Sequence, residues 1–178
     1  MTVRNVDLLT LPGDLRADAI FSTATLHWVL DHDRLFRALF DTLLPGGVLV
    51  AQCGGAGNLA KLRARADVWF RAPKLARHFE GWDGPWEFAD AETTADRLKR
   101  AGFVETKTSL FEAPTPLEDD REYRAFLAQV VLATYLDRIP DEADRDEVLD
   151  RLVEAARDDA PKRTLDYVRL DLSARRPL

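Results

Sequence analysis

The segment from Ala17 to Ala51 constrains the fold most, because it contains two strand-like apolar runs on either side of a helical stripe. Ala17–Ser22 is a short run of strand type. Val48–Ala51 is continuously apolar, as expected of a strand that is covered on both faces. Between them, Asp31–Leu44 repeats apolar residues every three or four positions, which predicts an amphipathic helix that ends at Pro45-Gly46-Gly47. Strand, helix and strand in this order predict a parallel α/β sheet.

The rest of the chain adds further elements to this pattern. Apolar or alternating runs predict strands at Val3–Leu9, Phe103–Phe111 and Leu165–Ala174, the last of them antiparallel. Helical spacing predicts helices over Asn58–Arg71, Asp90–Ala101, Arg121–Leu136 and Glu142–Ala156. Asn58 and Asp90 are the expected N-caps, and Gly102 is the expected residue after a helix end. The aromatic segment Pro73–Phe88, rich in glycine and proline, predicts an ordered loop or short helix.

Composition narrows the class of protein. The chain has 178 residues, which suits one domain, and a net charge of −6 with mixed signs, which argues against a nucleic-acid partner. The N-terminus lacks the features of a signal peptide, and no apolar run approaches the ~18 residues that span a bilayer, so no membrane partner is expected. The single cysteine, Cys53, excludes an internal disulfide and is read as a small buried hydrophobe. This fits the reducing cytosol, and a cytoplasmic location is expected.

Residues 17–52, ADAIFSTATLHWVLDHDRLFRALFDTLLPGGVLVAQ, resemble the middle of class I S-adenosylmethionine-dependent methyltransferases. The most similar branch includes trans-aconitate methyltransferase and malonyl-carrier-protein methyltransferases, which carry an FDxVFSNAALHWxxD-type stretch followed by LxPGGxLxxQ. Gly84-Pro85-Trp86 and the AxRLxxAGF stretch, Ala95–Phe103, also resemble that branch. The resemblance covers nearly the whole chain, and LHW together with LPGG is its moderately specific part.

The resemblance implies a Rossmann-like, mostly parallel sheet with an antiparallel last strand, preceded by a helical insertion over residues 113–162. Val3–Leu9 would be the third strand of that sheet. The family's first strand, with its ExGxGxG loop, and its second strand, with a ribose-binding acid, have no counterpart, so residues 1–178 are expected to form one incomplete domain. The implied function is S-adenosylmethionine-dependent methyl transfer to a small-molecule carboxylate or acyl compound. Because the central strand is missing, we expect weak or no cofactor binding and doubtful activity.

The resemblance also assigns cofactor-binding residues. Asp7 matches the acid that bonds the adenine amino group, and the backbone amide of Leu8 matches the one that faces the ring. Ser22, Thr23 and Ala24 match the stretch that lines the methionine end of S-adenosylmethionine, although the family usually has Asn where Thr23 stands. Ligands in open α/β sheets bind beyond the carboxyl ends of the strands, which is where Ser22–Ala24 would lie.

Four residues are candidates for the acceptor pocket. His27 and Trp28 match residues at the mouth of that pocket, and Trp82 and Trp86 lie in the segment that would cover the acceptor. His27 is the candidate catalytic residue, because it could orient an acceptor oxygen or act as a base near neutral pH; a structural role in the loop is equally open. Trp28 fits a core residue or a wall of the pocket, and Trp82 and Trp86 fit either a cover over an apolar substrate or anchors to the core.

Several alternatives remain open. Gly54-Gly55-Ala56-Gly57 fits a tight turn at the carboxyl edge of the sheet better than a phosphate-binding loop. Asp31 and Asp33 open a helix, where carboxylates favour the dipole, so no metal site is expected from them with His27 and His32. In place of an enzyme, the chain could be a non-catalytic remnant that binds a partner or forms a homodimer through an exposed sheet edge.

Overall fold

The computed structural model describes residues 2–178 and contains two compact units, which are described separately. The first comprises the chain up to Asn58 together with Pro85–Phe111 and Val168–Leu178; the second comprises Leu59–Gly84 and Glu112–Tyr167. None of the helices within residues 2–178 has the length and apolar character that a membrane crossing requires.

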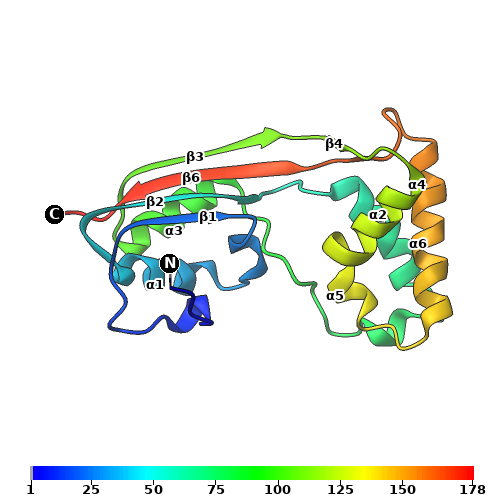
Figure 1. Cartoon of the computed structure of the whole chain (residues 1–178), viewed down its shortest axis with the longest axis horizontal. Coiled ribbons are helices and arrows are strands. Elements are labelled where there is room, and N and C mark those ends of the chain that lie inside the picture. The colour runs from blue at the N-terminus through cyan, green and yellow to red at the C-terminus, as the bar shows by residue number, and fades with distance from the viewer. Residues whose placement is uncertain (1) are drawn as a thin grey trace. The chain divides into compact units, whose positions relative to one another are not determined.

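The first unit is built on a four-stranded sheet in the order β1-β2-β6-β3 (Figure 1). The strands are β1 (Ala17–Thr23), β2 (Leu43–Gly54), β6 (Val168–Arg175) and β3 (Val104–Glu112). β1 and β2 are parallel, and β6 is antiparallel to β2. The arrows of β3 and β6 also point in opposite directions in Figure 1. The expected α/β class and the antiparallel last strand are therefore confirmed.

Two helices build the core against one face of this sheet. They are α1 (His32–Thr42) and α3 (Ala91–Ala101), and their buried residues join those of β2 and β6 in one cluster. Both N-caps are side-chain carboxylates: Asp31 accepts from the Arg34 amide at 2.9 Å, and Asp90 accepts from the Thr93 amide at 2.7 Å. Gly102 ends α3 with φ of +106°. The predicted cap at Asp90 and the predicted stop at Gly102 are confirmed.

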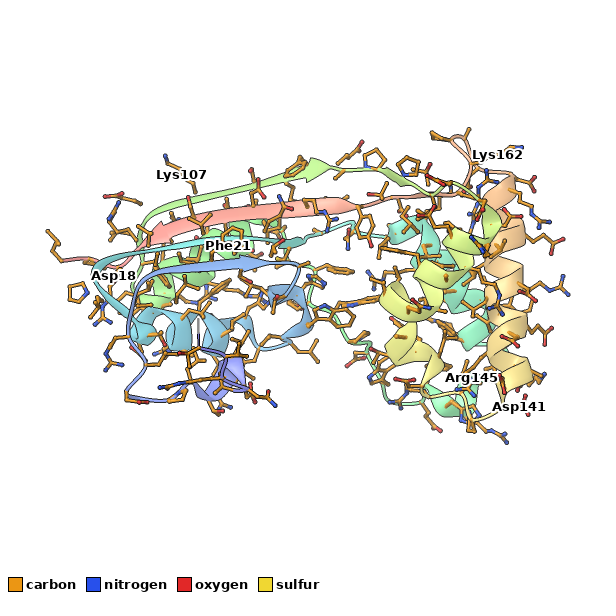
Figure 2. All side chains as sticks on the ribbon, in the orientation of Figure 1. Asp18, Phe21, Lys107, Asp141, Arg145 and Lys162 are labelled. Atoms are coloured by element: carbon orange, nitrogen blue, oxygen red, sulfur yellow. The ribbon has the colours of Figure 1, made fainter. Side chains whose placement is uncertain are left out.

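The other face of the sheet is open among the described residues. Leu49 and Ala51 of β2 are buried, whereas Val50 between them is 46% exposed and Phe21 of β1 is 78% exposed. A cavity of about 590 Å³ lies on this face, and its lining includes Phe21 and Lys107, which Figure 2 labels on β1 and β3. The expectation that Val48–Ala51 is covered on both faces is wrong, because α1 and α3 pack against the same face.

The second unit is mainly helical. It contains α2 (Ala60–Phe70), α4 (Asp120–Phe126), α5 (Ala133–Leu136) and α6 (Glu142–Arg157), with a short ladder between β4 (Thr115–Pro116) and β5 (Thr164–Leu165). A π-helical turn, Leu127–Val131, separates α4 from α5 where one helix over 121–136 was predicted. Asp141 caps α6 by accepting from the Asp144 amide at 3.1 Å, at the helix end labelled in Figure 2.

Two local predictions are wrong. Val3–Leu9 is not a strand: it leads into the 3₁₀ helix η1 (Leu8–Thr10), which Asp7 caps by accepting from the Leu9 amide at 2.8 Å. A strand needs a partner for its backbone groups, and β1 pairs only with β2 among the described residues. Asn58 does not cap α2, which starts after Leu59 without a side-chain cap; its Oδ1 accepts from the Val168 amide at 2.8 Å.

Candidate functional site

The candidate site lies where β1 and β2 end side by side. In the parallel register, Ser22 pairs with Ala51 and Thr23 pairs with Gln52, so the carboxyl ends of both strands meet at one edge of the sheet. Ala24 has φ of +53°, and its amide donates to the Gln52 carbonyl at 2.8 Å. This left-handed residue turns the chain sharply out of the sheet and into the 3₁₀ helix η2 (Leu26–Trp28). The structure thereby brings Ser22–Ala24 next to His27 and Trp28.

The His27 ring is fixed by the backbone of β2. Its Nδ1 accepts the Gly54 N–H at 3.2 Å, and the residue is only 8% exposed. Burial lowers the pKa of His27 to about 4, and the positive charges of Arg169 and His32 act in the same direction. The ring is therefore neutral at pH 7, and with Nδ1 acting as the acceptor its proton is on Nε2. Such a ring offers a hydrogen-bond donor rather than a base.

Aromatic rings surround this imidazole within the first unit. The His27 ring centroid lies 5.4 Å from that of Trp28 and 5.6 Å from that of Phe88. Trp86 lies 5.7 Å from Trp28 and 5.3 Å from Phe88, with which it stacks. The Glu87 amide donates to the His27 carbonyl at 2.9 Å and joins the two segments. His27, Trp28 and Trp86 are thus brought together, and Phe88 joins them although the sequence did not single it out.

Trp82 belongs to the second, helical unit, whereas Trp28 and Trp86 belong to the first. Its ring lies 4.7 Å from Tyr135 and 6.0 Å from Phe79, and the Arg138 guanidinium stands 4.6 Å above it. A cavity of about 690 Å³ borders this cluster. Within its own unit, Trp82 therefore packs against neighbouring side chains, which agrees with the alternative that it anchors its segment to the core.

Asp7 and Leu8 lie beside β1. Asp7 is exposed, and its Oδ1 is used to cap η1. Leu8 lines a cavity of about 600 Å³ together with residues from the first part of β1, among them Ala17 and Phe21. The lining of this cavity includes none of Ser22–Ala24, His27, Trp28 and Trp86.

The glycine cluster after β2 forms a tightly packed turn. Three of its amides are engaged: Gly54 donates to His27, Gly55 to the Val168 carbonyl at 3.1 Å, and Ala56 to the Ala89 carbonyl at 2.9 Å. A Cβ at Gly55 would come within 2.8 Å of the Leu170 Cβ, which cannot move without its backbone, so this position needs glycine. These amides cannot cradle a phosphate, and the interpretation as a turn is confirmed.

The acidic and histidine residues around α1 have structural partners. His32 Nε2 lies 3.1 Å from the Leu26 carbonyl and its Nδ1 lies 3.3 Å from Arg97, while Asp33 pairs with Arg100 at 2.6 Å. Asp31 is used as the N-cap of α1. Within residues 2–178, no group of three or more His, Cys, Asp or Glu side chains is arranged to hold a metal ion.

Arg169 of β6 is the polar residue that the sequence did not assign to the site. It pairs with Gly54 in the antiparallel register, and it is half-buried. Its positive charge contributes to lowering the pKa of His27, and it partly offsets the burial that raises the pKa of Cys53 to about 11. Alternation along residues 165–174 places Arg169 on one face with Asp171, but no local signal indicates which residue of β2 it would oppose.

Comparison with known families shows a match over the part of the chain that forms this strand end. Residues 2–51 match a family model described as a methyltransferase domain. Trans-aconitate 2-methyltransferase from Variovorax paradoxus is 49% identical over 41 residues, which are 23% of this chain and 16% of that protein. The enzyme of the same name from Delftia acidovorans is 46% identical over 67 residues, 38% of this chain and 25% of that protein. Each match thus covers a quarter or less of the relative's length.

Solved structures show the same fold. A protein described as a methyltransferase, from Bacillus halodurans C-125, superposes with a TM-score of 0.56 at 12% identity, and the match covers 97% of this chain and 76% of that one. A protein described as a sarcosine dimethylglycine methyltransferase, from Galdieria sulphuraria, gives a TM-score of 0.50 at 16% identity, covering 99% of this chain and 59% of that one. At these identities the likeness concerns the fold alone.

Proposed function

We propose that the chain is a class I methyltransferase of the branch that includes the trans-aconitate methyltransferases, and that it transfers a methyl group from S-adenosylmethionine to a small carboxylic acid or acyl compound. The match of residues 2–51 to a methyltransferase-domain model and the identity to two trans-aconitate 2-methyltransferases support this proposal. The observation that carries the proposal is the family match at the strand end where Ser22–Ala24, His27 and Trp28 gather. When bound, S-adenosylmethionine supplies a methyl group on a positively charged sulfur. With a carboxylate acceptor, an O–CH₃ bond forms, the S–CH₃ bond breaks and neutral S-adenosylhomocysteine leaves.

Each candidate residue then has a role. Ser22, Thr23 and Ala24 would line the methionine end of the cofactor, and Asp7 and Leu8 would contact its adenine. The residues fit only part of that molecule: Asp7 already caps η1, and the amides of Gly54, Gly55 and Ala56 are engaged within the protein. We therefore expect weak cofactor binding.

The acceptor side needs orientation more than acid/base equipment, since a carboxylate is already a nucleophile. His27 would donate from Nε2–H to an acceptor oxygen and so hold it in line with the methyl group. Trp28 and Trp86, with Phe88, would form an apolar wall that excludes water. Trp82 is a further candidate for acceptor contact.

Methyl transfer can be tested directly. The chain is incubated with S-adenosylmethionine carrying a ¹³C methyl group and with trans-aconitate, the acid named for its relatives, and the products are examined by mass spectrometry. A labelled monomethyl ester formed together with S-adenosylhomocysteine is the expected result. No labelled product across trans-aconitate, related small acids and acyl thioesters would overturn the proposal.

A non-enzymatic role is the second candidate, and the free edge of β1 favours it. β1 pairs only with β2 among the described residues, and Ala17–Thr23 contains no lysine or proline of the kind that usually protects an edge strand. Phe21 on this strand is largely exposed. Under this alternative the chain forms a homodimer through that edge, and light scattering after size-exclusion chromatography would give twice the monomer mass of 20.1 kDa.

A further inference from the structure

The Arg97 side chain connects to two neighbouring carbonyls of η2 through one residue each. Its Nη1 donates to Glu87 Oε1 at 2.8 Å and lies 3.3 Å from His32 Nδ1. The Glu87 amide donates to the His27 carbonyl at 2.9 Å, and His32 Nε2 lies 3.1 Å from the Leu26 carbonyl. Leu26 and His27 are consecutive residues of η2. One guanidinium is therefore linked by two separate paths to the turn that carries His27.

The tautomer of His32 completes the first path. A carbonyl oxygen only accepts, so the ring proton is on Nε2 and donates to Leu26, while Nδ1 accepts from Arg97. Burial lowers the pKa of His32 despite the bond to the Leu26 carbonyl, and the Arg97 charge lowers it further, so the ring is neutral at pH 7. The residue is only 2% exposed, and both of its ring nitrogens are used. Loss of the Arg97 guanidinium leaves the buried Nδ1 without its donor.

The second path fixes the aromatic segment of the site. Glu87 lies between Trp86 and Phe88 in the chain, and its carboxylate forms an ion pair with Arg97 of α3. The Arg97 side chain is 18% exposed, and its Nε also lies 3.9 Å from Asp33 Oδ2. Hydrogen bonds between charged partners are stronger than neutral ones, and partial burial reduces their screening. Arg97 thus ties α3, the aromatic segment and η2 together at the strand end.

We infer that Arg97 is a positioning residue of the candidate site, which holds the His27 ring on the Gly54 N–H by acting through Glu87 and His32. The inference rests on the proposed function, in which His27 orients the acceptor oxygen. It predicts that loss of the Arg97 guanidinium loosens His27 more than it loosens the rest of the sheet.

Hydrogen exchange of single amides tests this without any methyl transfer. The Gly54 amide of the full chain is protected by its bond to His27 Nδ1, and the Glu87 amide by its bond to the His27 carbonyl. In Arg97→Gln, NMR should show both amides exchanging roughly tenfold to a hundredfold faster, as expected when a charged hydrogen bond is lost. ¹⁵N spectra of the His27 ring at pH 7 should show the Nε2–H tautomer alone in the wild type and both tautomers in the variant.

Two controls separate positioning from a general loss of stability. The Arg176 amide, which donates to the Gly47 carbonyl at 2.9 Å outside this network, should change less than the Gly54 amide in Arg97→Gln. An ion pair that only stabilised the fold would raise the exchange of both amides by the same factor. Arg100→Gln is the matched variant, since Arg100 is on the same helix but pairs with the exposed Asp33 at 2.6 Å. It should leave the Gly54 amide and the His27 tautomer as in the wild type.

Two further variants keep the test valid if Arg97→Gln folds poorly, which circular dichroism would show. Arg97→Lys keeps the charge but not the planar guanidinium, and it should restore part of the protection of the Gly54 amide. Glu87→Gln breaks the ion pair and keeps the backbone amide, and it should also speed exchange at Gly54. In a chain that methylates acids, Arg97→Gln should lower kcat by roughly tenfold to a hundredfold and leave the KM for S-adenosylmethionine unchanged, because His27 is misplaced.

The inference is overturned if the Gly54 amide in Arg97→Gln exchanges no faster than the Arg176 amide does, relative to the wild type, or if Arg100→Gln has the same effect as Arg97→Gln. A chain that methylates acids while Arg97→Gln keeps the protection of Gly54 retains the proposed function and loses this inference. A chain in which Arg97→Gln frees the Gly54 amide, but which never methylates an acid, retains the positioning network and loses the proposed function.

Discussion

The imidazole of His27 continues the β1–β2 ladder beyond its last strand pair. The pairing ends at Thr23 and Gln52. Two residues further along β2, the Gly54 N–H donates a hydrogen bond to His27 Nδ1 at 3.2 Å. A buried amide that loses its strand partner needs another acceptor. The ring meets this need, and in doing so its tautomer and its position beside Trp28 and Phe88 are fixed.

This arrangement predicts a pH-dependent stability. The pKa of His27 is lowered from 6.5 to about 4 in the folded chain, so the unfolded chain binds the proton more tightly. The contribution of the neutral His27 ring to the free energy of unfolding is therefore complete above pH 6.5. It falls by about 2–3 kcal/mol as the pH is lowered towards 4. Urea unfolding at pH 7 and pH 4.5 measures it. In His27→Asn the difference between these two pH values should shrink by that amount; an unchanged difference would contradict the prediction.

Phe21→Lys tests the free edge of β1. If the chain dimerises through this edge, a lysine at Phe21 should restore the monomer mass in light scattering, because edge lysines oppose strand pairing. The side chain is exposed, so the free energy of unfolding should change by less than about 0.5 kcal/mol. Val68→Lys, at an exposed position of α2 in the helical unit, is the control and should leave the mass unchanged. A Phe21→Lys chain that still elutes as a dimer would exclude this edge as the interface.

Asp159 tests the helical unit. Its nearly buried carboxylate binds Arg65 through two hydrogen bonds of 2.9 and 2.7 Å and also pairs with Lys61. Asp159→Ala leaves the Arg65 guanidinium without this partner, and the free energy of unfolding should fall by about 2–3 kcal/mol, since both cations are partly exposed. Chemical denaturation measures the loss. The neighbouring exposed Asp158→Ala should have little effect, and equal losses in both variants would refute the role of the network.

Gly102→Ala should destabilise the end of α3. Gly102 has φ of +106°, and an added Cβ would lie 2.9 Å from the Phe40 ring, so backbone strain and a clash act together. We expect a loss of about 1–3 kcal/mol in the free energy of unfolding. Gly13→Ala is the control, because nothing lies within 4 Å of its Cβ position and its φ is ordinary. Thermal unfolding of both variants checks the difference.

Cofactor affinity provides a separate test. Calorimetric titration of the chain with S-adenosylmethionine should show binding weaker than micromolar. The reason is that Asp7 Oδ1 and the amides of Gly54, Gly55 and Ala56 are already engaged within the protein. Micromolar affinity would contradict this expectation and would mean that other groups hold the ribose and the amino-acid end.

Local signals predicted much of the fold. Asp90 and Gly102 mark both ends of α3, and the spacing of apolar residues predicted α1, because caps, turns and helix faces depend on neighbours within a few residues. The prediction of a strand at Val3–Leu9 is wrong for the opposite reason. Its apolar residues resemble those of a strand, but strand formation depends on a partner elsewhere in the chain, and Asp7 supplies a local turn instead.

The sequence by itself therefore determined the α/β class, the limits of α3 and the family resemblance carried by Ala17–Gln52. Only the tertiary structure decided that Val50 faces solvent and that His27 donates rather than accepts at Nε2. It also decided that Arg169 lies opposite Gly54, 115 positions away in the chain by their residue numbers. The register of an antiparallel pair depends on long-range packing, and a shift of one residue would turn Arg169 to the other face.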